Sequence, residues 1–225
     1  MSATAGGAQQ AGRRRGRRTA FADDSTPELR ETILAATAVL LGTRRFSDLS
    51  VADILAAAGI SRGSFYFYFD SKYDVLAELV TRAVAQGHQA AEPWLANPSD
   101  KIAALRAGIT AGARLWKAHA PILRAIVENW RTEPRLTDLW LGQMQTFTDA
   151  TIAQITDDPD ATENLAGRDI AAVASSLTWL GEQLYYLAAT DTPPWANEDV
   201  LIDTLLHIWT STLYGQPTRS GDHER

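Results

Sequence analysis

Apolar residues recur at helical spacing along most of the chain. In the first such segment they fall every three or four positions, at Leu29, Ile33, Ala36 and Leu40. Thr26 stands before them as a candidate N-cap, Pro27 suits a first helical turn, and Gly42 suits a helix end. The pattern predicts an amphipathic helix from residue 27 to about residue 42.

A short second helix is expected just downstream. Ser50 precedes Asp53 by three positions, which is the spacing of a capping box. The stretch Val51–Ala58 follows, and Gly59 suits the sharp turn at its end. The sequence therefore predicts a helix over residues 51–58 and a turn at residue 59.

The next segment contains an unbroken run of five aromatic residues, from Phe65 to Phe69. Such a run also suits a β-strand, because large rings pack well on a pleated surface. However, Ser61 can cap a helix, and no second strand candidate lies nearby for pairing. We therefore predict a second short helix, followed by a long amphipathic helix that opens at Asp70 and Ser71.

Prolines divide the rest of the chain into further amphipathic segments. They predict five more helices, at about residues 101–118, 121–131, 135–156, 166–189 and 197–214. An acidic cluster surrounds Pro159 and is interpreted as a solvated loop, with loose metal binding as the alternative; its members are Asp157, Asp158, Asp160 and Glu163. No segment alternates as a strand does, so the predicted fold class is all-α, with about nine helices.

Composition narrows the class of protein. With 45% apolar and 21% charged residues, the 225-residue chain can bury a core. The absence of cysteine excludes disulfides and thiolate metal sites and is typical of a reducing compartment. No run of about 18 apolar residues is present, and no apolar segment of an export signal follows the first arginines. We expect a cytoplasmic protein without a cofactor or a metal.

Charge is distributed unevenly along the chain. The net charge is −6, yet residues 1–22 carry no acid and five arginines, Arg13, Arg14, Arg15, Arg17 and Arg18. Residues 1–26 are rich in Gly, Ala, Gln and Arg without a periodic apolar face, which predicts a disordered basic arm. A basic arm on an acidic body is typical of polyanion binders, although a solvated or tag-like tail fits the charge equally well.

Three short helices with a glycine turn before the third match a helix-turn-helix, whose third helix enters the major groove of DNA. Phe65 and Phe69 share one side of that helix, which suits packing against its supports. Arg62 and Tyr66 share another side, which suits base edges, although an ion pair and a packing ring are the ordinary alternatives. Gly63 has no side chain, so the backbone there can approach DNA closely.

Polar groups near these helix starts can also meet DNA. Ser64 can donate a hydrogen bond to a base or to the backbone of DNA. The amides that open helices at Ser50 and Ser71 can hold phosphate oxygens, and Lys72 adds a cation there. The sequence thus predicts both base and phosphate contacts in this region.

The same region resembles a family signature. Glycine, aromatics and lysine fall at the spacing of the TetR family of transcriptional repressors in the stretch Gly59-Ile60-Ser61-Arg62-Gly63-Ser64-Phe65-Tyr66-Phe67-Tyr68-Phe69-Asp70-Ser71-Lys72. The resemblance runs from about residue 27 to residue 79. A weaker resemblance to the EthR-like subgroup comes from the arginine-rich arm, the run Phe65–Phe69 and the segment His207–Gly215. Family members are all-α homodimers with an N-terminal DNA-binding domain and a larger ligand-binding and dimerisation domain.

The resemblance implies domain bounds and DNA contacts. We expect a disordered basic arm at residues 1–26, a helix-turn-helix domain at 27–72, an effector-binding and dimerisation domain at 73–215 and a flexible tail at 216–225. The family's DNA-contact positions fall on Ser50, Arg62, Gly63, Ser64, Tyr66, Tyr68 and Lys72. Gly63 stands where many members have proline, and Ala52 where some have arginine. We therefore expect the arm arginines to add phosphate and minor-groove contacts.

Aromatic residues form two stripes in the C-terminal half, Trp140–Met144–Phe147 and Trp179–Glu182–Tyr186. Such stripes are usually core packing, but family members enclose a ligand cavity between these helices, and aromatic walls suit an apolar ligand. The resemblance implies a ligand site at Trp116, Trp140, Met144, Phe147, Thr178, Trp179, Glu182, Tyr186 and Trp209. Thr178 and Glu182 would orient the ligand, unless Glu182 is a structural buried acid or an exposed one.

The last predicted helix is apolar on two sides, with one row at Leu201, Leu205 and Ile208 and another at Ile202, Leu206, Trp209 and Leu213. A helix buried on two faces in a small domain needs a second partner, which a two-fold four-helix interface like the family's dimer would supply. Together these features predict a homodimeric repressor that binds a double-stranded DNA operator. A hydrophobic small molecule is expected to release it, and no membrane partner is expected.

Two other functions remain as alternatives. A small helical enzyme is disfavoured, because the histidines are scattered and no HExxH, GxSxG, P-loop or GxGxxG pattern occurs. A membrane-surface or lipid-binding module held by the arginine arm is disfavoured, because the arm is poor in large apolar residues for insertion. Salt-sensitive binding to anionic vesicles but not to duplex DNA would favour the second alternative.

Overall fold

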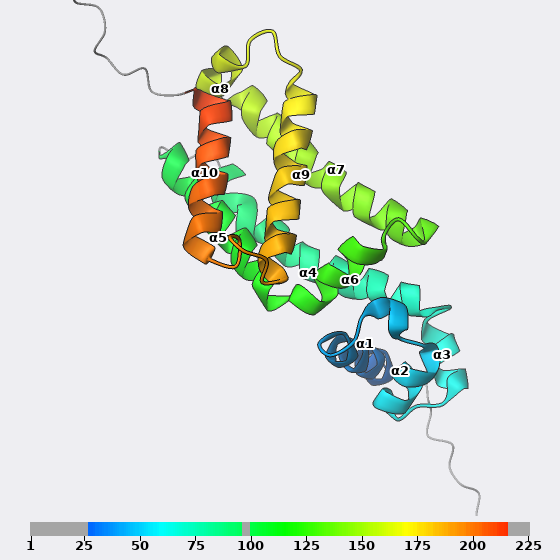
Figure 1. Cartoon of the computed structure of the whole chain (residues 1–225). Helices are drawn as coiled ribbons and strands as arrows, with labels where there is room; N and C mark the ends of the chain where they lie inside the picture. Colours follow the sequence, from blue (N-terminus) through cyan, green and yellow to red (C-terminus); the bar gives the residue numbers. More distant parts are fainter. Residues whose placement is uncertain (1–26, 96–99, 216–225) are drawn as a thin grey trace, which may run out of the picture.

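The computed structural model describes residues 27–95 and 100–215 of the chain (Figure 1). These residues form ten α-helices and one short 3-10 helix and contain no strand, which confirms the predicted all-α class. The elements are α1 (Pro27–Leu41), η1 (Phe46–Asp48), α2 (Val51–Ala58), α3 (Arg62–Tyr68), α4 (Lys72–Leu95), α5 (Lys101–Ala118), α6 (Ala120–Asn129), α7 (Pro134–Asp157), α8 (Pro159–Asn164), α9 (Ile170–Ala189) and α10 (Glu198–Tyr214). None of these helices is long and apolar enough to cross a membrane. The predicted arm and tail, residues 1–26 and 216–225, lie outside the described residues.

Local capping explains where the short helices begin and end. In the predicted capping box, Asp53 donates its backbone N–H to the Ser50 hydroxyl at 3.2 Å, and Ser50 donates its own N–H to the Asp53 carboxylate at 2.8 Å. Gly59 ends α2 with a φ of 66°, a left-handed conformation that favours glycine. Ser61 then caps α3 by accepting the N–H of Ser64 at 3.0 Å. The predicted turn between α2 and α3 is confirmed.

The helices are arranged along α4. Figure 1 shows α1, α2 and α3 at one end of the molecule and α8 at the other, with α4 running from the first end toward the second. α4 packs against α1 and also against α5, α6 and α7. Its 24 residues correspond to a length of about 36 Å. One helix therefore connects the helix-turn-helix with the C-terminal helices.

The apolar core continues across both parts of the molecule. One buried cluster includes Ile33 of α1, Phe65 of α3, Leu76 of α4, Ile126 of α6 and Trp140 of α7. A second cluster joins α5, α7, α8, α9 and α10. An ion pair between Asp74 and Arg135 adds a polar contact between α4 and α7. The helix-turn-helix is thus packed directly on the C-terminal helices.

The acidic segment around Pro159 forms a helix, α8, so its interpretation as a loop is wrong. Asp158 is the N-cap of α8 and accepts from the backbone N–H groups of Asp160 and Ala161. Its carboxylate is buried and binds the Lys101 ammonium at 2.6 Å. An acidic N-cap followed by proline at the first helical position favours a helix start, and the loop interpretation overlooked this signal.

Candidate functional site

One face of α3 is exposed and carries residues expected to meet DNA. Arg62, Gly63, Tyr66 and Phe67 fall on this side of the seven-residue helix. The side chain of Phe67 is 68% exposed and that of Tyr66 is 45% exposed, although large rings are usually buried. Arg62 makes no hydrogen bond or ion pair with another described residue, so its guanidinium is available to a partner.

The opposite face of α3 points into the protein. Phe65 is fully buried, as its spacing predicts. Ser64 is only 5% exposed, and its hydroxyl bonds that of the N-cap serine at 2.7 Å. Tyr68 is half-buried and packs against the core. Both side chains face inward in the free chain, because positions i and i+4 share a face of a helix. The base contacts of Ser64 and Tyr68 stay predictions. The outward position belongs to Phe67, which the sequence reasoning missed.

Lys72 also points inward. Its Nζ donates to the backbone carbonyls of Leu49 at 2.6 Å, Phe46 at 3.0 Å and Ser47 at 3.4 Å. The ammonium lies 4.7 Å from the centre of the Phe46 ring, and burial lowers the pKa of Lys72. Three carbonyls occupy the three N–H donors of the ammonium. Lys72 therefore has a structural role, in which it holds η1 against the start of α4. Its phosphate contact stays a prediction.

Ser50 lies exposed at the start of α2, but its polar atoms are engaged. Its amide and hydroxyl both bond to Asp53, which also pairs with Arg44 at 2.9 Å. These contacts, the Ser50 hydroxyl first, hold the pKa of Asp53 well below its usual range. A phosphate at this helix start would lie beside a carboxylate, so the contact predicted for Ser50 is less favourable than the sequence implies.

The basic arm cannot be placed relative to α3. Its arginines, Arg13, Arg14, Arg15, Arg17 and Arg18, lie outside the described residues. Their contacts with DNA therefore stay a prediction from sequence and charge. Among the described residues, the outward face of α3 is the part of the predicted DNA site whose side chains are exposed and form no hydrogen bond or ion pair with another described residue.

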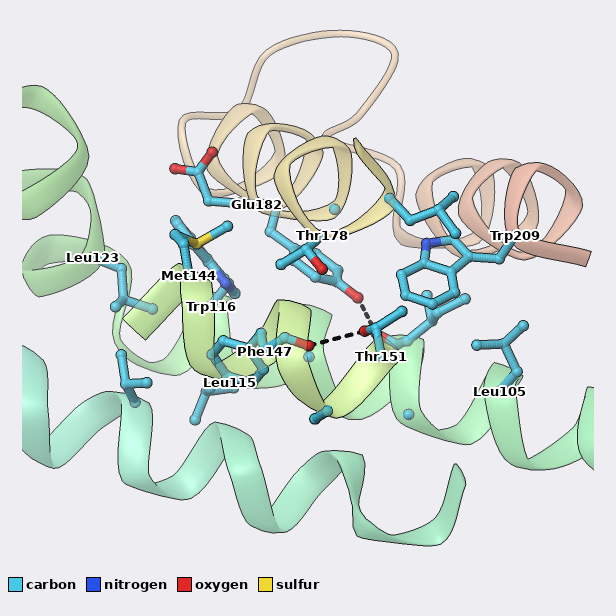
Figure 2. A pocket seen from close by; sticks show the side chains of 18 of the residues that line it. Leu105, Leu115, Trp116, Leu123, Met144, Phe147, Thr151, Thr178, Glu182 and Trp209 are labelled. Atoms are coloured by element: carbon cyan, nitrogen blue, oxygen red, sulfur yellow. Dashed lines mark hydrogen bonds between the residues drawn. The ribbon is translucent and has the colours of Figure 1, made fainter. Parts of the chain in front are cut away.

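A cavity of about 180 Å³ lies among the C-terminal helices. It is bounded mainly by α5, α7 and α9, with Trp209 of α10 at one end (Figure 2). Seven of the nine predicted ligand-binding residues line it: Trp116, Trp140, Met144, Phe147, Thr178, Glu182 and Trp209. Four leucines and Ile109 add to a mainly apolar wall. The structure therefore brings most of the predicted ligand site together around one cavity.

The cavity wall also contains residues that the sequence reasoning missed. Tyr185 donates its hydroxyl proton to the carbonyl of Ile109 at 3.1 Å, and burial raises the pKa of Tyr185 well above its usual range. Gly112 makes room for this ring, because a Cβ there would lie 2.8 Å from the Tyr185 hydroxyl oxygen. Thr151 donates to the carbonyl of Phe147 at 2.9 Å (Figure 2). The glycine was a usable signal, since glycine inside a helix often marks a close approach.

Two predicted ligand-binding residues lie outside the cavity lining. Trp179 packs on Trp130 with ring centres 6.1 Å apart, and the Tyr186 hydroxyl donates to the Glu128 carboxylate at 3.3 Å. Trp179 and Tyr186 therefore face the α6 side of the molecule. The structure does not bring these two residues to the cavity, because positions 179 and 186 lie about 100° around α9 from the cavity-facing positions 178 and 185.

Glu182 is the acidic residue of the cavity wall. Glu182 is only 8% exposed. The alternative that it is an exposed acid is therefore excluded. Glu182 makes no hydrogen bond or ion pair with another described residue. Burial raises its pKa to about 7, although the charge of Arg131 acts in the opposite direction. The cavity wall therefore includes an acidic residue whose carboxyl group receives no hydrogen bond from the described residues.

The last helix is already packed within its own chain. Four of its apolar residues are buried, Leu201, Ile202, Leu205 and Leu213. They pack in the cluster that α10 shares with α5, α8 and α9. Leu206 and Ile208 are half-buried, and Trp209 lines the cavity. Most of the two-sided apolar pattern is thus explained inside one subunit, and the homodimer stays a prediction.

Two family models match the chain in succession. Residues 33–79 match the bacterial regulatory proteins of the tetR family, and residues 105–215 match the C-terminal domain of the transcriptional regulator EthR. The chain is 35% identical over 217 residues to the HTH-type transcriptional regulator EthR of Mycobacterium tuberculosis, covering 95% of this chain and 99% of that one. The EthR of Mycolicibacterium smegmatis is 33% identical, over 89% of this chain and 92% of that one.

Solved structures show the same fold at lower identity. NalD, the secondary repressor of the MexAB-OprM multidrug efflux pump in Pseudomonas aeruginosa, superposes with a TM-score of 0.69 at 20% identity. The match covers 85% of this chain and 100% of that chain. A regulator from Syntrophomonas wolfei described as a putative TetR-family protein gives 0.68 at 14% identity, covering 85% and 98%. The whole described fold therefore has counterparts among proteins of this type.

Proposed function

Because the chain belongs to the TetR family of helix-turn-helix transcriptional regulators and carries an EthR-type C-terminal domain, we propose that it is a ligand-responsive repressor. This is a family of regulators and not of enzymes. In the proposal, residues 27–72 bind DNA, and residues 73–215 bind an effector and form a homodimer. Two copies occupy a palindromic operator, and a small apolar effector releases them.

The exposed face of α3 is the observation that carries the proposal. Arg62 stands unpaired at the first turn, where a guanidinium can bind the O6 and N7 atoms of a guanine with two hydrogen bonds. Gly63 lets the backbone approach the groove, and Tyr66 extends the polar edge by one turn. Phe67 presents an apolar ring that suits a thymine methyl group. The exposed face of α3 therefore offers both hydrogen bonds and an apolar contact to base edges.

The charge distribution supports a role for the arm. Residues 27–72 carry five basic and five acidic residues, and the inward position of Lys72 removes one cation from the DNA-facing surface. Phosphate attraction supplies most non-specific DNA affinity, so it must come from elsewhere in the chain. In the proposal, the arm arginines supply it.

The position of α4 supports release by an effector. Val84 of α4 lines the cavity, and α4 begins only four residues after the end of α3. Arg135 of α7, a helix that also lines the cavity, pairs with Asp74 in the first turn of α4. An effector that fits one arrangement of α4 and α7 better than another would shift the population of DNA-binding states.

A selection from random duplex DNA at one fixed salt concentration tests the proposal. The full chain should enrich an inverted repeat whose half-sites are about 34–36 Å apart, or a multiple of that distance, because each copy presents one α3 to the major groove. The Arg62→Ala variant is the matched control and should lose the enriched sequence. Failure of the full chain to enrich any sequence would contradict the proposal.

Removal of residues 1–22 tests the arm. The logarithm of DNA affinity falls linearly with the logarithm of salt concentration, by about 0.9 per phosphate contact. Five arginines in contact with phosphates should therefore reduce the slope by roughly 4–5 units per subunit when they are removed. An unchanged slope would show that the arm does not bind DNA.

A further inference from the structure

The chemistry of the cavity wall defines what kind of molecule it can hold. Figure 2 shows Glu182 and Trp209 toward opposite ends of the cavity with Thr178 between them, and it shows the Glu182 carboxylate at the rim, beside Met144. Glu182 is more than nine-tenths buried, yet no described residue donates a hydrogen bond to it. Burying a carboxylate without a partner is costly, so a protein interior normally supplies a cation or several donors. Here no described residue donates a hydrogen bond to the carboxylate, and Arg131, whose charge acts on Glu182, forms no ion pair with it.

The hydroxyl groups of the wall do not offer donors either. Thr151 and Thr178 each donate their proton to a carbonyl one turn back in their own helix, at 2.9 Å. Tyr185 donates its proton across to α5 at 3.1 Å. All three hydroxyl protons are therefore already used within the protein, and the hydroxyl groups can act toward a ligand only as acceptors. The other side-chain donors of the wall are neutral indole N–H groups, and that of Trp140 is completely buried.

We infer that the effector of this cavity is a compact apolar molecule that carries a protonated amine, with the amine at the Glu182 end. This inference rests on the proposed function, because it names the chemical class of the proposed effector. An ammonium brings both the positive charge and the N–H donors that Glu182 lacks. A carboxylate brings neither and would be repelled by Glu182 once that group is ionised.

The size of the cavity limits the apolar part. A dry cavity of about 150 Å³ lined by apolar side chains holds one benzene molecule. The 180 Å³ cavity of this chain therefore has room for one ring with a short substituent. The matched test series is benzylamine, benzyl alcohol and benzoate, which share a ring and one carbon and carry a positive, a neutral and a negative group.

Calorimetric titration of the full chain at pH 8, without DNA, tests the inference. We expect benzylamine to bind at least tenfold more tightly than benzyl alcohol, and benzoate to bind most weakly. Glu182→Gln keeps the shape of the side chain and removes its charge, so it should bring benzylamine to within about threefold of benzyl alcohol. Glu163→Gln removes an exposed acid from α8 and should leave the amine preference unchanged.

Benzyl alcohol binding serves as the check that the cavity of the Glu182→Gln variant is intact. Equal binding of benzoate and benzylamine, an undiminished amine preference in Glu182→Gln, or binding of none of the three compounds would each overturn the inference. Release of DNA is measured separately, with an operator from the selection experiment. Amine binding without DNA release would support the ligand class and contradict the proposed release mechanism.

Discussion

The two candidate sites treat their polar groups differently. Around α3, the inward polar groups are satisfied by the protein: Lys72 binds three carbonyls, and Ser64 is bonded to its helix cap. In the cavity wall, Glu182 is also buried but has no such partner. Polar groups that are hydrogen-bonded within the protein stabilise the local structure. A buried polar group without a hydrogen bond lowers the stability of the folded chain until a ligand supplies the missing partner. The comparison separates residues whose polar groups are bonded within the protein from residues whose hydrogen bonds a ligand would supply.

Arg62 and Glu182 illustrate the same difference in another way. Both lack a partner among the described residues, but Arg62 is exposed to water and Glu182 is buried. Water satisfies the guanidinium at little cost, so replacing Arg62 should alter DNA binding alone. The carboxyl group of Glu182 affects the folded protein itself, so its replacement should alter stability as well as ligand binding.

The largest expected effect comes from Lys72→Met, which keeps the aliphatic stem and removes the ammonium. The carbonyls of Ser47 and Leu49 would lose their donor, and that of Phe46 would keep only the N–H of Leu49. We expect the free energy of unfolding in urea to fall by about 4 kcal/mol, because each unsatisfied group costs about 1–3 kcal/mol. A variant as stable as the parent chain would contradict the structural role and restore a phosphate contact as the better explanation.

The next effect depends on pH and concerns Glu182→Gln. Because burial raises the pKa of Glu182 from 4.5 to about 7, the native state holds a proton that the unfolded state has already lost between these values. The free energy of unfolding of the parent chain should therefore fall as pH rises from 4.5 to 7 and stay low above 7. At pH 8 the raised pKa of Glu182 should lower the free energy of unfolding by about 3 kcal/mol relative to low pH.

Measurement at two pH values isolates this term. The difference in stability between a Gln and a protonated Glu at position 182 does not depend on pH. The free energy of unfolding of Glu182→Gln, relative to that of the parent chain, should therefore increase by about 2 to 3 kcal/mol between pH 5 and pH 8. The charge that Arg131 places near Glu182 is present throughout this range. A difference that does not change with pH would mean that the carboxyl group is solvated in the folded chain.

Local signals made the helix-turn-helix predictable from sequence. The Ser50–Asp53 spacing and the conformational freedom of Gly59 act within a few residues, and both produced the predicted geometry. The facing of Ser64, Tyr68 and Phe67 was harder, because a seven-residue helix gives too few apolar positions to define its inward side from the pattern alone. Lys72 was unpredictable in another sense, since its carbonyl partners lie more than 20 residues away in sequence.

The cavity was predictable as a set of residues but not as a geometry. Aromatic spacing identified two helices of the wall, and seven of the nine predicted residues line the cavity. Trp179 and Tyr186 were misplaced because an aromatic stripe has the same spacing on either side of a helix that is buried on several faces. Tyr185 depends on the room that Gly112 leaves on another helix, which only the packing of α5 against α9 reveals.

Arg62→Ala sharpens the comparison on the exposed side. Loss of a two-hydrogen-bond contact with guanine should reduce discrimination at that base pair by about 2 kcal/mol, which is close to 30-fold. The urea unfolding curve should be unchanged, since Arg62 has no partner among the described residues. Affinities for the selected operator and for a copy with that base pair replaced provide the measurement. Equal loss on both sequences would assign Arg62 to phosphate contact.

The smallest expected effect comes from Phe67→Ala. The ring is largely exposed in the free protein, so its removal should leave stability within about 0.5 kcal/mol or raise it slightly. If the ring contacts a thymine methyl group, operator affinity should fall by about 1 kcal/mol, and replacing that thymine by uracil should cost the parent chain a similar amount. The uracil substitution should then leave the affinity of the Phe67→Ala variant unchanged, because removing the ring and removing the methyl group abolish the same contact. If the affinity losses from the two changes are additive, Phe67 does not contact the thymine methyl group. That result would contradict a role for Phe67 in base recognition.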